Sequence, residues 1–336
     1  MSLKMVENSI RKAVELGEKF VVKFVDIGEG NGKLNNGVLQ AEKSDKYLQH
    51  LDQEAVFMNR TKRILSTNHK RQLDKMVFDV ELEAGRIEGV PQVLSDSQEP
   101  VFSDRSFDAE ELRALTGLHR TVMKDSIEGQ GFMNTLTSRF AVANGLGLER
   151  ILIYGNKSSN DNTVKSGYKV IDGICKKLTD SADVNNETID LTATDSNPLY
   201  EFRALLDEFP DVYKIDGGMA CFAPSLFTRS IYRFIADNVN KYDIGDARIN
   251  KDGVPVVENV PIISVPQFSQ PKNGFTKKPI ILTHKENIQW LTDPQEIIVE
   301  SAFNLRANVW DIASTMYADI NFAQEDATAL AWLKEA

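Results

Sequence analysis

The clearest pattern of hydrophobic and polar positions lies near the end of the chain. Between residues 310 and 322 apolar or small side chains occupy every second position, and mostly polar ones lie between them. This period of two predicts a β-strand. The alternation continues beyond the ~10 residues of an ordinary strand. A strand of this length is typical of an extended sheet rather than of a compact one.

Other segments predict further strands. Residues 20–27 are rich in β-forming side chains, residues 75–83 alternate as in a half-buried or edge strand, and short strands are expected at 219–223 and 280–283. Residues 254–265 contain Pro255 and Pro261 and are followed by Pro266, which predicts an edge strand or a broken one.

Spacings of three and four predict helices between these strands. The longest apolar stripe runs from Phe132 to Ile151, with Gly145 and Gly147 indicating close packing or an early helix end. Asn197 followed by Pro198 is a good helix start, because the asparagine can cap the helix and proline suits its first position. Further helices are expected near residues 3–13, 48–58 and 227–234. The fold class is therefore α+β.

Composition and charge limit the possible functions. The chain has 336 residues, of which 42% are hydrophobic and 26% charged, so it can bury one large core or two modest ones. Its formal net charge of -10 gives no overall attraction to nucleic acid or to an anionic membrane. Cys175 and Cys221 lie far apart, and we expect two reduced, partly buried thiols.

One basic group stands out in this acidic chain. Between residues 60 and 75 Asp74 is the single acid, and the basic residues are Arg60, Lys62, Arg63, Lys70, Arg71 and Lys75. Two interpretations are open: a contact surface for another subunit, or a solvated loop whose charges aid solubility.

Searches for catalytic chemistry give one candidate. Gly28, Gly30 and Gly32 resemble the glycine-rich motif of S-adenosylmethionine-dependent methyltransferases, in which glycines let the backbone approach the cofactor. The stretch after Gly32 breaks helices, whereas that motif must lead into one at once, so a plain turn is the stronger interpretation. The four histidines are scattered without metal-ligand spacing, and no nucleophile motif is present. We therefore predict no catalytic, cofactor-binding or metal residues, no cofactor and no enzymatic activity.

The order of elements from about Gly37 to Leu333 resembles the major capsid proteins of tailed bacteriophages with the Hong Kong 97-type fold. The similar segments include VLQAEKSDKYLQHLDQEAVFMNR (38–60), Phe132 to Asn156 ending ERILIYGN, Asp172-Gly173-Ile174, GGMACFAPSLFTRSIYRFIAD and DINFAQEDATALAW. The resemblance implies an N-terminal segment and arm (1–60), an extended E-loop (61–105), a peripheral domain with a long spine helix (106–155 and 285–336) and an axial domain (156–284).

The resemblance also implies a function. Such a protein self-assembles into hexamers and pentamers that form the icosahedral head around a double-stranded DNA genome, which it encloses without sequence-specific binding. It is made in the bacterial host cytoplasm, resides in the virion and needs no membrane. With only about 36 residues ahead of the arm helix, we expect a separate scaffolding protein, besides a portal. Two alternatives are an encapsulin-like shell protein and a methyltransferase that uses Gly28–Gly32.

Overall fold

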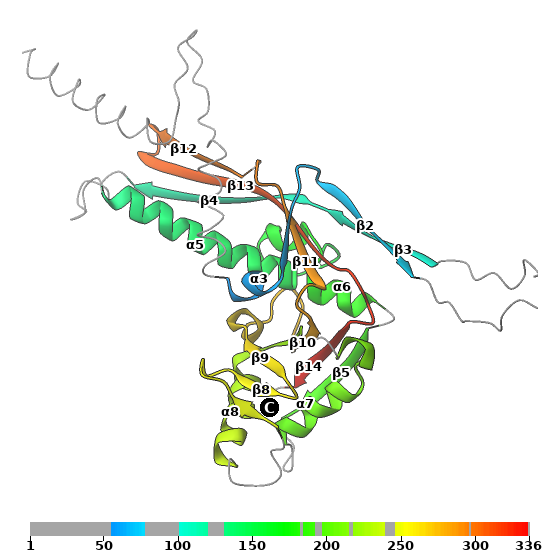
Figure 1. Ribbon diagram of the computed structural model, residues 1–336. Helices are drawn as coiled ribbons and strands as arrows, with labels where there is room; N and C mark the ends of the chain where they lie inside the picture. Colours follow the sequence, from blue (N-terminus) through cyan, green and yellow to red (C-terminus); the bar gives the residue numbers. More distant parts are fainter. Residues whose placement is uncertain are drawn as a thin grey trace, which may run out of the picture.

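The computed structural model describes residues 55–77, 101–119, 131–181, 184–191, 197–214, 218–238, 246–295 and 297–334. Two sheets and a projecting hairpin dominate the described part of the chain (Figure 1). The helix and strand expected at 3–13 and 20–27, and the glycines at 28–32, lie outside the described residues, as do most of the arm segment 38–60 and the end of the strand expected at 75–83.

The first sheet is built around a single long strand, β13 (Val309–Phe322), whose 14 residues confirm the strand predicted from the alternation. Strands β11 (Ile288–Thr292) and β12 (Ile298–Asn304) follow one another along one edge of β13, and β4 (Glu110–His119) lies along the other edge. Strand β1 (Lys62–Leu65) pairs in parallel with β11 and completes five strands.

The two faces of β13 are covered by different elements. Its apolar face packs against helix α5 (Gly131–Tyr154), and Asn144 of that helix donates a hydrogen bond of 2.8 Å to Ser314. Its polar face is covered towards the C-terminal end, where Asp319 and Asn321 are buried although the alternation suggested an exposed face. This end of the sheet is therefore covered on both faces.

Helix α5 continues past the two glycines that suggested close packing or an early end. It runs to Tyr154, and a Cβ atom at Gly147 would meet nothing within 4 Å. The close approach lies at Gly155 and Gly173, where a Cβ atom on Gly155 would lie 2.3 Å from the carbonyl oxygen of Ile171. Gly173 donates a backbone hydrogen bond of 2.9 Å to Gly155. Two backbones thus meet directly where α5 ends and α6 (Ile174–Asp180) begins.

The second sheet has seven strands, and most neighbouring strands in it are not consecutive along the chain. In spatial order they are β5 (Asn185–Asp190), β14 (Thr328–Lys334), β10 (Lys278–His284), β6 (Met219–Ala223), β9 (Val260–Ser264), β8 (Pro255–Val257) and β7 (Arg248–Ile249). The proline-containing segment is the broken strand that its sequence predicted, because Glu258 and Asn259 form the β8–β9 turn with φ of 48° and 64°.

Helices α7 (Pro198–Asp207) and α8 (Ser225–Asp237) cover one face of this sheet and form a hydrophobic cluster with it. The other face of the sheet contributes to a second hydrophobic cluster, which contains α5. Strand β6 is consequently buried at every position, as expected for a strand covered on both sides. The predicted cap of α7 is confirmed, since the Asn197 side chain accepts a hydrogen bond of 3.0 Å from Leu199 N.

Two of the expected segment boundaries differ from the observed strand pairing. The expected E-loop begins at residue 61, but β1 belongs to the five-stranded sheet, and the hairpin consists of β2 (Lys70–Val77) and β3 (Val101–Asp108). Residues 285–336 were expected in one domain, but β14 pairs with β10 and β5 of the other sheet. The apolar sequence TALAWLK explains this pairing, because it suits an interior strand.

The remaining described elements are short: α3 (Val56–Arg60) and the 3-10 turns Ser166–Lys169, Asp211–Tyr213 and Pro266–Ser269. Among the described residues, no helix combines the length and the apolar character that crossing a bilayer requires.

Candidate functional site

The predicted basic residues do not form a single patch in the structure. Lys62 lies on β1, where its Nζ is 3.6 Å from a carboxylate oxygen of Glu286, and Arg63 lies 5.8 Å above the ring of Trp290. Lys70 begins the hairpin and lies 3.4 Å from Asp108.

Arg60 ends α3 and is exposed, and Arg71 is exposed on β2. The backbone of Lys75 pairs with Ser103, and nothing is described of its side chain. The group is thus divided between the α3–β1 segment and the start of the hairpin, and Lys62 and Lys70 each lie beside a carboxylate of the same chain.

The hairpin β2–β3 extends away from both sheets (Figure 1). Its two strands pair with one another over eight positions, from Lys70 with Asp108 to Val77 with Val101. Its base contains Leu73, which packs with Phe107, Leu291 and Tyr317 in a small separate cluster. Among the described residues, the hairpin has few partners beyond this base, so it is suited to contact with another molecule.

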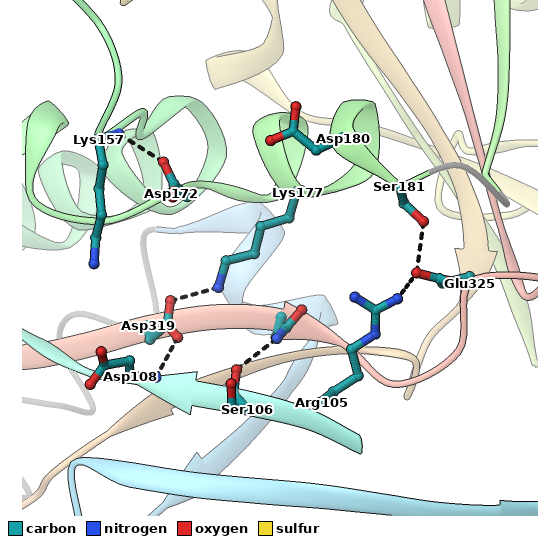
Figure 2. A pocket seen from close by; sticks show the side chains of 11 residues that line it. Arg105, Ser106, Asp108, Lys157, Asp172, Lys177, Asp180, Ser181, Asp319 and Glu325 are labelled. Atoms are coloured by element: carbon teal, nitrogen blue, oxygen red, sulfur yellow. Dashed lines mark hydrogen bonds and ion pairs between the residues drawn. The ribbon is translucent and has the colours of Figure 1, made fainter. Parts of the chain in front are cut away.

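A polar cavity of about 540 Å³ lies where the hairpin leaves the body of the protein. Its charged lining comprises Arg105, Lys157, Lys177, Asp108, Asp172, Asp180, Asp319 and Glu325, contributed by β3, α6, β13 and adjoining loops (Figure 2). Sequence reasoning did not predict that these residues lie together, because the elements that supply them are far apart along the chain.

Three links join β3 to the end of β13 at this cavity. Asp108 N donates to the Asp319 carboxylate at 2.9 Å, and Asn321 Nδ2 donates to the Ser106 carbonyl oxygen at 2.9 Å. Arg105 pairs with Glu325 (Figure 2), and its guanidinium group lies 4.6 Å above the Phe322 ring. These contacts fix the angle at which the hairpin leaves the sheet.

Asp319 is the centre of this junction. Burial raises the pKa of its carboxyl group, while Lys177 and the hydrogen bonds it accepts act in the opposite direction. Lys177 Nζ lies 3.0 Å from Asp319 Oδ1, so α6 is attached to the same carboxylate as β3. One sequence signal could have pointed to Asp319: it lies on the polar face of a predicted strand that is longer than an ordinary strand.

A second buried carboxylate holds the segment where the described chain begins. Glu149 of α5 is 1% exposed and accepts a hydrogen bond of 2.5 Å from Phe57 N at the start of α3. Burial raises its pKa to about 7, against the lowering effect of the backbone N–H groups of Phe57 and Met58. Helix α3 is further held by Phe57, which packs edge-on to Phe222 at 5.1 Å.

Neither cysteine has the surroundings of a reactive thiol. Cys175 and Cys221 are free and fully buried, and burial raises the pKa of each thiol. A thiolate is therefore disfavoured at both positions. The partly buried, reduced thiols expected from the sequence are in fact completely enclosed.

Comparison with known proteins provides related chains. No protein-family model matches this chain. A chain of Bacillus subtilis strain 168 that is named as a prophage capsid protein, YqbE, is 21% identical over 301 residues, which cover 88% of this chain and 92% of the relative.

Solved structures give the same result for the fold. The satellite phage P4 procapsid chain aligns with a TM-score of 0.57 at 12% identity, covering 87% of this chain and all of that one. A chain of Gordonia phage Cozz aligns with a TM-score of 0.57 at 9% identity, covering 84% and 87% of the two chains.

An encapsulin of Synechococcus elongatus aligns less closely, with a TM-score of 0.51 at 13% identity over 90% of this chain and 92% of the encapsulin. Phage capsids and an encapsulin thus share one architecture with this protein. The resemblance inferred from the order of elements is confirmed: the chain has the Hong Kong 97-type fold, and its sequence is similar along most of its length to that of the Bacillus subtilis prophage protein.

Proposed function

We propose that this protein is the major capsid subunit of a tailed phage or prophage, and that it assembles into hexamers and pentamers of an icosahedral head around double-stranded DNA. The projecting hairpin is the observation that carries the proposal. It extends from the body of the chain, and a polar junction fixes its direction. A single chain gains little from such an element, whereas in a shell each hairpin has a neighbouring subunit to contact.

The charge pattern is consistent with a container for DNA. The acidic chain has no overall attraction to phosphate groups, so DNA inside the shell remains free to be packaged and released. The protein then acts as a structural subunit without enzymatic activity, made in the host cytoplasm and located in the virion. A separate scaffolding protein and a portal are the partners that the resemblance implies.

Sedimentation of the purified protein tests the proposed assembly. We expect rings or shells that sediment far faster than a chain of 37.7 kDa. A stable monomer at high protein concentration would contradict the proposal, and binding of S-adenosylmethionine by that monomer would favour the methyltransferase alternative.

The encapsulin-like alternative is favoured by one observation, the shared fold of the Synechococcus elongatus protein. The contents of particles isolated from the native host separate the two functions. Particles that protect double-stranded DNA from nuclease support the capsid, whereas particles that contain a cargo protein and no genome support the compartment.

We further propose that the exposed members of the basic group dock on an acidic surface of an adjacent subunit. Identical acidic chains repel one another, so assembly requires places where opposite charges meet. Each exposed pair contributes only about 0.2–1 kcal/mol, but the contacts recur at every interface. We expect a variant with four changes to Glu to fold but to form no shells; the changed residues are Lys62, Arg63, Lys70 and Arg71. We also expect assembly of the original protein to weaken as the salt concentration rises. Normal assembly of the variant at low salt would show that these charges are only solvated.

A further inference from the structure

A groove of about 1110 Å³ lies between β4 and α5. Residues 112–116 of β4 form one side, and residues of α5 between positions 140 and 151, the loop 161–168 and the turn 271–276 complete it. This volume exceeds the roughly 300–1,000 Å³ of a small-molecule site, so it suits a segment of polypeptide. We call this cavity the β4 groove.

Strand β4 borders the groove with an edge that is available for pairing. One edge of β4 pairs with β13 at every position from Glu110 to His119, and no other strand in the described part of the chain pairs with β4. Five successive residues of β4 line the groove, so the groove follows the edge of the strand and not a single face. The backbone N–H and C=O groups of such an edge can bind an additional strand.

The lining of the groove combines apolar surface with basic charge. Its larger apolar side chains include Phe140, Ile151, Val164 and Phe275, and its basic ones are Arg113, Arg150, Lys165 and Lys272. Asp161 is its single acid, and the carboxylate already accepts two hydrogen bonds from Thr163. Within the described residues, Arg113, Lys165 and Lys272 form no ion pair. The groove therefore suits a strand with one apolar side and one acidic side.

The sequence at the end of the β2–β3 hairpin has this composition. Residues 76–83 belong to the segment that the alternation predicts to be a half-buried or edge strand. Its apolar positions are Met76, Phe78, Val80 and Leu82, and its acidic positions are Asp79, Glu81 and Glu83. Residues 78–100, which connect β2 to β3, contain six acidic residues and one basic residue, Arg86. Their charge is thus opposite to that of the groove.

The hairpin and the groove lie in opposite directions along the same chain. Strand β4 follows β3 after one residue, Ala109, and both strands lie beside β13, so the hairpin extends away from the β4 groove (Figure 1). Val101, where β3 begins, is separated from Leu112 by roughly 35 Å of extended chain. The end of the hairpin is therefore directed towards a neighbouring copy and not towards its own groove.

We infer that residues 76–83 at the end of the hairpin add a strand to the edge of β4 in a second copy of this chain. The apolar side chains then enter the groove, and the acidic ones lie beside Arg113, which is exposed while Leu112 packs in the cluster that contains α5. Opposite charges on neighbouring strands stabilise such a pairing. The inference rests on the proposed function and names the surface on which each hairpin docks.

Charge reversal on each side tests this contact. A groove variant carries Arg113→Glu and Lys272→Glu, and a hairpin variant carries Glu81→Lys and Glu83→Lys. Each variant alone should require at least about tenfold more protein for assembly than the original chain, because like charges then meet at the contact. All four changes in one chain restore opposite charges, so this chain should recover most of the assembly.

A matched control carries Lys251→Glu and Lys285→Glu, which change the net charge as the groove variant does. Both lysines are exposed and lie outside the groove, so the control should assemble normally. Circular dichroism and thermal melting verify that all variants fold.

Cross-linking identifies the copy that supplies the strand. In a chain with Leu115→Cys and Glu81→Cys, a flexible bismaleimide should join neighbouring subunits and give dimers and larger multimers on a denaturing gel. Leu115 is 69% exposed, whereas the natural Cys175 and Cys221 are fully buried and should not react. Each single-cysteine variant should give monomers.

Three results would exclude the contact while the proposed function stands: assembly of either charge-reversed variant at the original protein concentration, failure of the four combined changes to improve on the single variants, or a cross-linked product that remains monomeric. If the original chain itself forms neither rings nor shells, the proposed function fails instead.

Discussion

At the scale of single residues, Glu149 shows how a buried carboxyl group can hold a chain segment. Its carboxylate is enclosed between α5 and α3 and accepts a hydrogen bond from Phe57 N. Sequence patterns could not have identified it, because it lies within an amphipathic helix and its partner is 92 positions away. By contrast, the cap formed by Asn197 was predictable, since the cap and the proline that follows it are adjacent in the sequence.

The raised pKa of Glu149 predicts a specific dependence of stability on pH. The folded-state pKa of about 7 lies above the ordinary value of 4.5, so the folded state holds this proton more tightly than the unfolded state. Stability from this group is fully present below pH 4.5 and is lost as pH rises through 7. At 1.36 kcal/mol per pKa unit the loss is on the order of 3 kcal/mol.

Glu149→Gln keeps an oxygen acceptor for Phe57 N but cannot ionise. The difference in the free energy of unfolding between the variant and the original protein should therefore grow by about 3 kcal/mol, in favour of the variant, as the pH rises from 4.5 to 8. Urea denaturation of the unassembled subunit at several pH values measures this difference. Parallel stability curves for the two proteins would show that Glu149 does not titrate in this range.

At the scale of elements, the two sheets are joined where the chain crosses between them. Besides the earlier passage from β4 to β5 through α5 and α6, the chain makes two crossings, first from β10 to β11 and then back from β13 to β14. Asn287 lies in the first crossing, where its Nδ2 donates to Thr328 Oγ1 at 2.7 Å and its Oδ1 accepts from Gln324 N at 2.8 Å in the second. One buried amide therefore connects the two crossings.

Asn287→Ala should destabilise the subunit by about 2–4 kcal/mol, because it leaves several buried donors and acceptors of the second crossing without a partner. Asn304→Ala is a matched control. Asn304 also accepts backbone hydrogen bonds, from Arg306 N and Ala307 N at 3.2 Å, but it is exposed at the end of β12. Its loss should cost less than about 1 kcal/mol. Equal shifts of the two urea midpoints would contradict the connecting role of Asn287.

The hairpin also belongs to this scale, and Arg105 is its most specific attachment. Arg105→Ala removes the pair with Glu325 and the contact with the Phe322 ring. These contacts together are worth about 1 kcal/mol, so amide hydrogen exchange at the base of β3 should become roughly five times faster. Arg71→Ala, an exposed arginine of the same hairpin, should leave exchange unchanged. Unchanged exchange in the Arg105 variant would show that the other two links between β3 and β13 hold the hairpin in place without Arg105.

At the scale of the whole molecule, the sequence allowed the fold class and much of the element order to be predicted. The period of β13, the helix of α5 and the α7 cap all depend on local spacing, and local spacing can be read directly. The pairing of β14 with the other sheet and the position of β1 depend on distant partners. The basic residues are close together in the sequence, which predicted one group. In the structure they lie on different elements, because β1 belongs to the five-stranded sheet and β2 to the hairpin.

The central claim is that many copies of this chain form a closed shell. Electron cryomicroscopy of the purified, full-length protein tests it most directly. The account predicts closed particles built from five- and six-membered rings, in which each β2–β3 hairpin lies on a neighbouring subunit. The account would be contradicted if folded subunits remained monomers or formed open aggregates without rings.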